Sequence, residues 1–229
     1  MNIHAIKQGL YGLYLTNSFG FRLRKIKDSV EIKRLRLGYS MAQLEALNIH
    51  VSIVNKEKLP KEGQYLIVIN HRSIIDPPIV EVALKDTQIF GPWISKKELY
   101  NSFFFGLFVR NGGSILLDRE KNKMSGFFAD IKKAVQRGES IFIFPEGTRN
   151  KSDKKLTTFK EGSRIIALKN RLPILPLYIE SHANEALSRA LNGQKSAQEI
   201  RIVVGDIIDY KERKPLEISY RERFNLGED

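Results

Sequence analysis

A histidine and an aspartate stand five positions apart, at His71 and Asp76, in the segment NHRSIID that directly follows the apolar run YLIVI. If a turn or helix begins near Ser73, the aspartate can fold back and accept a hydrogen bond from one imidazole nitrogen. The opposite nitrogen is then a fixed proton acceptor, able to take a proton from a hydroxyl group. The same spacing also suits a plain turn, because Asp76 precedes Pro77 and Pro78.

A second polar segment, FPEGTR at 144–149, ends another apolar run. Pro145 removes a backbone donor and so ends the strand, and Gly147 allows a turn that other residues resist. Arg149 is then presented beside Glu146. A planar and permanently charged guanidinium is suited to phosphate recognition. The alternative is that Glu146 and Arg149 only form a salt bridge that closes the loop.

Three further cations follow predicted strands, namely Lys96 and Lys97 in SKKEL and Arg119 in LLDR. Solvated surface charge is the ordinary explanation for such residues. Their position favours an anion site next to the proton acceptor at His71. A serine hydrolase that uses Ser73 is a competing hypothesis, but the Gly-x-Ser-x-Gly turn that such enzymes need is missing.

The pattern of apolar residues predicts alternating strands and helices, which is typical of an α/β fold with a mostly parallel central sheet flanked by helices. In such sheets ligands bind beyond the carboxyl ends of the strands, where the polar segments stand. The tail from Lys211 is expected to be loosely ordered. Strands are predicted at 64–70, 88–95, 114–118, 139–146, 173–180 and 199–209. Helices are predicted at 3–16, 21–47, 99–111, 121–138, 161–170 and 184–192.

The first part of the chain, residues 1–47, is interpreted as an amphipathic and basic two-helix segment, and 48–229 as the α/β domain. Apolar groups beside dense Lys and Arg favour a helix that lies on an anionic membrane interface. The alternative is a surface helix whose apolar face packs on the domain. The most apolar short run, SFFFGLFV at 102–109, is too short to span a bilayer. We therefore expect a peripheral or monotopic protein on the cytoplasmic face of the membrane.

The charge of the chain narrows the class of partner. The 229 residues carry a net charge of +12, which predicts attraction to nucleic acid, an acidic protein, a phosphorylated ligand or an anionic membrane. No nucleic-acid-binding motif is found, so nucleic acid is not expected, although a non-catalytic basic module remains an alternative. There is no cysteine, and the four histidines are scattered, so no metal site is expected.

Taken together, the segments resemble the glycerophospholipid acyltransferase family. NHRSIID is similar to the family's first motif, His-x4-Asp preceded by Asn, and SKKEL at 95–99 is similar to its small-Lys-x-Glu-Leu segment. GSILLDR at 113–119, FPEGTR, and LPILPLYI at 172–179 resemble the second, third and fourth motifs in the same order. The resemblance covers about residues 45–205, and within the family it is greatest to the bacterial 1-acyl-sn-glycerol-3-phosphate acyltransferases.

This resemblance implies a reaction. His71 would be the general base that deprotonates the free sn-2 hydroxyl of lysophosphatidic acid, and Asp76 would orient it. The hydroxyl oxygen would attack the thioester of acyl-CoA or an acyl-carrier protein, with no cofactor besides this co-substrate. Other acceptors remain open, such as glycerol 3-phosphate, a lyso-ornithine lipid or another lysophospholipid.

The resemblance also implies a site for the phosphate of the acceptor. Arg149, with Lys96 and Arg119, would bind the phosphate, and the turn at Gly147 would shape the loop that presents Arg149. The substrate-binding residues implied in this way are Lys96, Arg119, Glu146, Gly147, Thr148 and Arg149.

Overall fold

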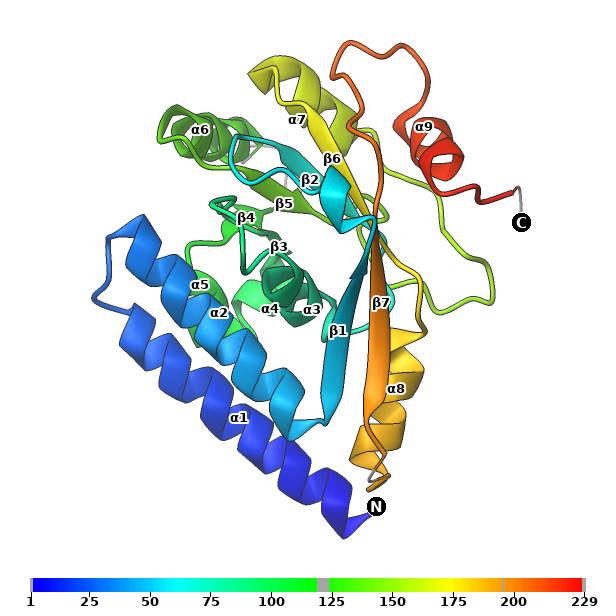
Figure 1. Ribbon diagram of the computed structural model, residues 1–229. Coiled ribbons are helices and arrows are strands. Elements are labelled where there is room, and N and C mark those ends of the chain that lie inside the picture. Colours follow the sequence, from blue (N-terminus) through cyan, green and yellow to red (C-terminus); the bar gives the residue numbers. More distant parts are fainter. Residues whose placement is uncertain (1, 119–123, 195, 228–229) are drawn as a thin grey trace.

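A five-stranded sheet forms the centre of the protein in a computed structural model, which describes residues 2–118, 124–194 and 196–227 (Figure 1). The strand order is β1-β7-β6-β2-β5. Neighbouring strands are parallel except β6 and β7, which are antiparallel. The prediction of a mostly parallel sheet is therefore confirmed. The strands are β1 (Ile49–Val54), β2 (Leu66–Ile69), β5 (Ile141–Ile143), β6 (Ile174–Ile179) and β7 (Gln198–Val204).

Helices cover both faces of this sheet. All four residues of β2 are fully buried, and they alternate between two core clusters. Ile67 and Ile69 pack in a cluster with α2, α3 and α8, whereas Leu66 and Val68 pack in one with α6, α7 and α9. The described helices are α1 (Ile3–Leu23), α2 (Ser29–Ala46), η1 (Lys56–Lys58), α3 (Asp76–Ala83), α4 (Lys97–Tyr100), α5 (Gly106–Asn111), α6 (Met124–Gln136), α7 (Gly162–Asn170), α8 (Ala183–Leu191) and α9 (Leu216–Arg223).

A second, two-stranded parallel sheet consists of β3 (Ile94–Lys96) and β4 (Ile115–Leu117). The predicted strand at 88–95 is therefore wrong over most of its length. Its irregular part nevertheless lies against β5 and the residue before it. Phe142 of β5 donates its N–H to the carbonyl of Pro92 at 3.0 Å, and Ser140 donates to that of Phe90 at 2.8 Å. A Cβ at Gly91 would lie 1.7 Å from the carbonyl oxygen of Ser140, so only glycine permits this approach.

The two N-terminal helices lie side by side (Figure 1). The predicted end of the first helix and the predicted start of the second are wrong. α1 continues to Leu23, and α2 begins only at Ser29, where Asp28 caps it by accepting from the N–H of Glu31 at 2.9 Å. α2 packs against α3 with part of its basic side turned inward. Burial lowers the pKa of Lys33, and Arg36 is only 3% exposed. α2 thus packs on the domain, and its buried residues are both apolar and polar.

Other departures from prediction have local causes. The predicted helix at 99–111 is interrupted at 101–105, where the hydroxyl of Ser102 accepts the backbone N–H of Phe104 and of Phe105, each at 3.2 Å. β1 was not predicted, although IHVSIV alternates as a strand does. The described part of the tail, up to residue 227, is ordered rather than loose, since α9 forms and buries Tyr220 completely. None of the described helices is long and apolar enough to cross a membrane.

Candidate active site

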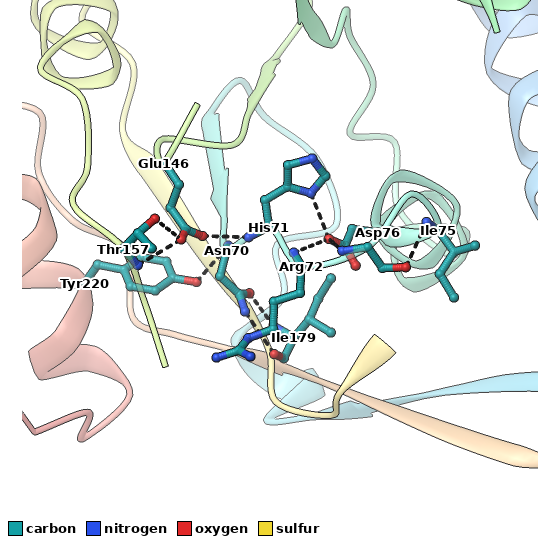
Figure 2. A network of polar contacts seen from close by, with 10 residues as sticks. Asn70, His71, Arg72, Ile75, Asp76, Glu146, Thr157, Ile179 and Tyr220 are labelled. Atoms are coloured by element: carbon teal, nitrogen blue, oxygen red, sulfur yellow. Dashed lines mark hydrogen bonds and ion pairs between the residues drawn. The ribbon is translucent and has the colours of Figure 1, made fainter. Parts of the chain in front are cut away.

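The histidine of NHRSIID lies just beyond the end of β2, where it contacts the first residue of α3. Its Nδ1 lies 2.8 Å from Oδ2 of Asp76, a contact that Figure 2 marks with a dashed line. The side chain of Asp76 is almost fully buried, whereas that of His71 is 19% exposed. The fold-back of the aspartate that the spacing allowed is therefore present, and it occurs at a helix start that carries Pro77 and Pro78.

Hydrogen bonds to Asp76 determine which nitrogen of the imidazole carries the proton. Oδ2 also accepts the backbone N–H groups of Arg72 and Ser73, each at 2.7 Å. A carboxylate with three such contacts acts as an acceptor, so Nδ1 of His71 is the donor. In the neutral imidazole, Nε2 then carries the lone pair and is the nitrogen that can accept a proton.

One face of the imidazole is covered by an aromatic ring. The rings of His71 and Phe144 stack with centroids 3.9 Å apart and an angle of 11° between planes. The ring of Trp93 stacks in turn on Phe144, at 5.0 Å and 26°. The orientation of the imidazole is therefore fixed by a hydrogen bond at Nδ1 and by a stack on its face.

The loop after β5 is attached to the backbone of the histidine. Glu146 is 2% exposed, and its Oε1 accepts the N–H of His71 at 2.7 Å (Figure 2). Its Oε2 accepts the N–H and the hydroxyl of Thr157, at 2.9 and 2.5 Å. The carbonyl of His71 accepts the N–H of Asn150 at 2.6 Å. Both oxygens of Glu146 are thus engaged by groups other than Arg149, which argues against the simple loop-closing salt bridge.

Asn70 and Tyr220 were not among the predicted site residues, and they hold the backbone next to His71 in place. The side chain of Asn70 joins β2 to β6, since it donates to the carbonyl of Ile179 at 3.0 Å and accepts its N–H at 2.8 Å. The hydroxyl of Tyr220 donates to the carbonyl of Leu177 at 2.6 Å and accepts the N–H of Asn70 at 3.3 Å. Burial raises the pKa of Tyr220 well above its ordinary value, so this hydroxyl stays protonated.

A cavity of about 910 Å³ opens beside the histidine. Its lining includes His71, Lys96, Gly147, Thr148 and Arg149. Most of the remaining lining is apolar and aromatic, from α5, α6 and the ends of β3 and β5. The cavity therefore combines a proton acceptor, cations and a wall suited to a hydrocarbon chain.

The remaining predicted cations and the alternative nucleophile have different positions. Arg119 lies outside the described residues. Lys97 forms an ion pair with Asp118 at 3.3 Å. Ser73 is fully buried, and its hydroxyl accepts the N–H of Ile75 at 3.5 Å, which disfavours the serine-hydrolase hypothesis. Within the described part of the chain, no group of three or more His, Asp and Glu side chains could hold a metal ion.

Comparisons with known proteins place the chain in a family. Residues 50–180 match the profile of the family described as Acyltransferase, and the chain belongs to this family. A 1-acyl-sn-glycerol-3-phosphate acyltransferase of Helicobacter pylori is 36% identical over 146 residues, which cover 62% of this chain and 60% of the relative. One of Bacillus subtilis is 32% identical over 126 residues, 55% of this chain and 60% of the relative. The chain thus spans less than two thirds of the length of these relatives.

The fold has a counterpart among solved structures. The crystal structure of the 1-acyl-sn-glycerophosphate (LPA) acyltransferase PlsC from Thermotoga maritima matches with a TM-score of 0.69, over 98% of this chain and 93% of that chain. The two sequences are 19% identical, so this likeness concerns the fold. It includes the α/β sheet and the two N-terminal helices.

Proposed function

We propose that the chain transfers a fatty acyl group from an acyl thioester to the sn-2 hydroxyl of 1-acyl-sn-glycerol 3-phosphate, which gives phosphatidic acid. The observation that carries the proposal is the His71–Asp76 hydrogen bond at the wall of a largely apolar cavity that also contains cations. Membership of the acyltransferase family and the names of the relatives agree with it.

The chemistry assigned to the dyad is general-base catalysis. Nε2 of His71 takes the proton of the acceptor hydroxyl while the hydroxyl oxygen attacks the carbonyl carbon of the thioester. A C–O bond forms, the C–S bond breaks, and the proton is passed to the leaving thiolate. Asp76 keeps Nδ1 protonated and stabilises the imidazolium that forms. A thioester is already activated, so positioning and proton transfer are sufficient and no further cofactor is required.

The phosphate of the acceptor is assigned to the cations of the cavity. Arg149 and Lys96 both line it with His71, and Arg149 offers a planar guanidinium for two hydrogen bonds to phosphate oxygens. Thr148 adds a hydroxyl donor, and Gly147, with φ of +71°, provides the turn that presents them. Arg119 is proposed as a further phosphate ligand on the resemblance alone.

The test is acceptor-dependent release of thiol from oleoyl-CoA by purified full-length chain. Wild type should release thiol only with lysophosphatidic acid present, and His71→Ala should lower the rate by about 10²–10⁴-fold or more. His182→Ala is the matched control, because His182 is an exposed histidine at the start of α8. Release without acceptor would indicate a thioesterase instead. An oleoyl carrier protein as second donor determines which thioester is used.

A panel of acceptors tests the finer part of the proposal. Glycerol 3-phosphate, lysophosphatidylcholine and a phosphate-free lysolipid are compared with lysophosphatidic acid at equal concentration. Cations in the cavity predict the highest kcat/KM for lysophosphatidic acid. Faster turnover of the phosphate-free acceptor would contradict the assignment of the phosphate site.

We further propose that α1 docks on an anionic lipid surface, where these substrates are found. Ile3, Leu10, Tyr14 and Phe21 are each at least 62% exposed, and their spacings of 7, 4 and 7 residues put them on one helical face. Phe103, in the loop before α5, is 86% exposed. Exposed basic residues occur within and just after α1, as an anionic interface requires. The exposed cations are Lys7, Arg22, Arg24, Lys25 and Lys27.

Vesicle co-sedimentation tests this surface. The double variant Leu10→Asp/Tyr14→Asp should lose most of its binding to phosphatidylglycerol vesicles, since two charges would be forced into the interface. Ile218→Asp is the control, because Ile218 is an exposed apolar residue on α9. Equal binding by the double variant and the control would contradict the proposed surface.

A further inference from the structure

We propose that a buried ion pair between Arg36 of α2 and Glu81 of α3 is a positioning device for the catalytic histidine. The inference rests on the proposed function, in which His71 is the base. The lipid surface proposed above lies on α1. α2 packs on the domain instead, and the ion pair gives this helix a role in catalysis.

The guanidinium of Arg36 lies deep in the protein. Its Nη2 is paired with Oε1 of Glu81, and the two side chains are 4% and 11% exposed. Its Nη1 donates to the carbonyl of Gly91 at 2.8 Å, and the ring of Phe90 lies 4.9 Å from its central carbon. α2, α3 and the segment beside β5 therefore meet at one charged group.

From the glutamate a series of contacts continues to the imidazole. The same Oε1 of Glu81 accepts the indole N–H of Trp93 at 2.8 Å. The indole stacks on Phe144 at 5.0 Å, and Phe144 stacks on His71 at 3.9 Å. The ion pair thus determines where the indole lies, and the indole supports the ring that covers one face of the imidazole.

The short helix α3 acts on the imidazole directly through Asp76 and indirectly through Glu81. Asp76, its first residue, holds Nδ1, and Glu81, on its second turn, holds the indole behind the aromatic stack. If α3 moves, the acceptor at Nδ1 moves with it, and so does the carboxylate that holds the indole behind Phe144. Displacement of a catalytic group by about 1 Å can cost 10²-fold in rate. An ion pair that holds α3 against α2 should therefore affect the rate of the chemical step.

Stability alone is a weak explanation for this pair. The cost of desolvating two charges offsets most of their attraction, and buried ion pairs can often be replaced by apolar residues of similar volume without loss of stability. Arg36, Glu81 and Trp93 also line the cavity that contains His71. Loss of the ion pair should therefore lower kcat even where the protein remains folded.

The test removes both charges together, so that neither is left buried and unpaired. In Arg36→Met/Glu81→Leu we expect kcat to fall about 10–100-fold, with the KM of donor and acceptor within about 2-fold. The melting temperature should fall only moderately, because the indole N–H of Trp93 and the carbonyl of Gly91 lose a partner but no charge is left unpaired. The matched control is Arg34→Met/Glu31→Leu, which removes an ion pair of 2.6 Å from the exposed side of the same helix. This control should keep the wild-type kcat.

Three single variants separate the contacts of the series. Glu81→Gln keeps an acceptor oxygen for the indole and should retain more activity than Glu81→Ala. Trp93→Phe keeps an aromatic ring on Phe144 but loses the N–H, so its kcat should fall by a smaller factor than in the double variant. If the double variant fails to fold, Trp93→Phe still decides, because an unchanged kcat there would overturn the proposal.

A readout independent of turnover is the NMR shift of the imidazole C–H groups of His71. They lie in the ring current of Phe144, so the double variant should move them toward the values of an exposed histidine, while Arg34→Met/Glu31→Leu should not. Unchanged shifts with unchanged kcat would refute the positioning role. An effect confined to KM would refute it too, because it would indicate contacts of the cavity wall with the acyl chain.

If His71→Ala retains activity, the proposed function itself fails. If His71→Ala is inactive and the double variant is fully active, only this inference fails.

Discussion

The two halves of the candidate site are built in opposite ways. On the side of the base, Asp76 and Glu146 are 0% and 2% exposed, and their hydrogen bonds hold the side chain and the backbone of His71. On the side of the cations, Arg149 is exposed and Lys96 is only partly buried. Both sides line the same cavity.

This difference follows from what each half has to do. Proton transfer requires heavy atoms within about 2.6–3.2 Å of each other, so the base must be held precisely. Attraction between charges falls only slowly with distance, and a long side chain can adjust to an anion as it arrives. Substitutions on the side of the base should therefore lower kcat and stability. Substitutions on the side of the cations should mainly weaken binding of the acceptor.

The largest effect is expected at the dyad. Asp76→Asn keeps the size of the side chain but removes the charge that keeps Nδ1 of His71 protonated and stabilises the imidazolium. We expect kcat to fall about 10²–10⁴-fold, with little change in KM for lysophosphatidic acid. Steady-state kinetics measures both constants, and Asp206→Asn, at an exposed ion pair with Lys58, is the control. A normal kcat in Asp76→Asn would contradict this comparison, because the buried half of the site would then not determine the rate of the chemical step.

A smaller effect is expected at Tyr220, whose hydroxyl contacts the backbone next to His71. Tyr220→Phe preserves the ring but leaves the N–H of Asn70 and the carbonyl of Leu177 without their buried partner. Stability should fall by about 1–3 kcal/mol, which lowers the melting temperature by roughly 2–4 °C for each kcal/mol in a chain of this size. Thermal unfolding followed by circular dichroism measures this shift.

The control for this prediction is Tyr11→Phe, since Tyr11 is exposed on α1. Its melting temperature should remain that of wild type. If Tyr220→Phe were equally stable, α9 would not support the base, and the half that contains His71 would be less rigidly built than its contacts indicate.

Continuous apolar runs made much of the sheet predictable. LIVI is buried on both faces, as a strand between two helical layers must be, and the polar segments after β2 and β5 do converge at their carboxyl ends. Helix ends depend on local side-chain bonds, such as the cap at Asp28 and the turn at Ser102, which apolar spacing does not reveal. The direction of the basic side of α2 was also beyond prediction, because Arg36 needs a partner 45 residues away in Glu81.

Within the site, the contact of His71 with Asp76 was predictable because it is local. The partners of Glu146 were not, since one is the backbone of His71, 75 residues away. Tyr220 is different, because a signal was present in the sequence. Leu216, Tyr220 and Phe224 recur at i, i+4 and i+8, which is the apolar face of a helix, but the surrounding charges favoured a loose tail.

The smallest effect is expected on the cation side. Arg149→Ala should raise KM for lysophosphatidic acid up to about 10-fold, as expected for a charge-assisted contact worth about 1.5 kcal/mol, and leave kcat within about 2-fold. Arg213→Ala, at another exposed arginine, is the control. Because exposed charges are screened by salt, raising ionic strength should increase KM more in wild type than in Arg149→Ala. A fall in kcat with constant KM would contradict the comparison, since Arg149 would then act in the chemical step as the buried half does.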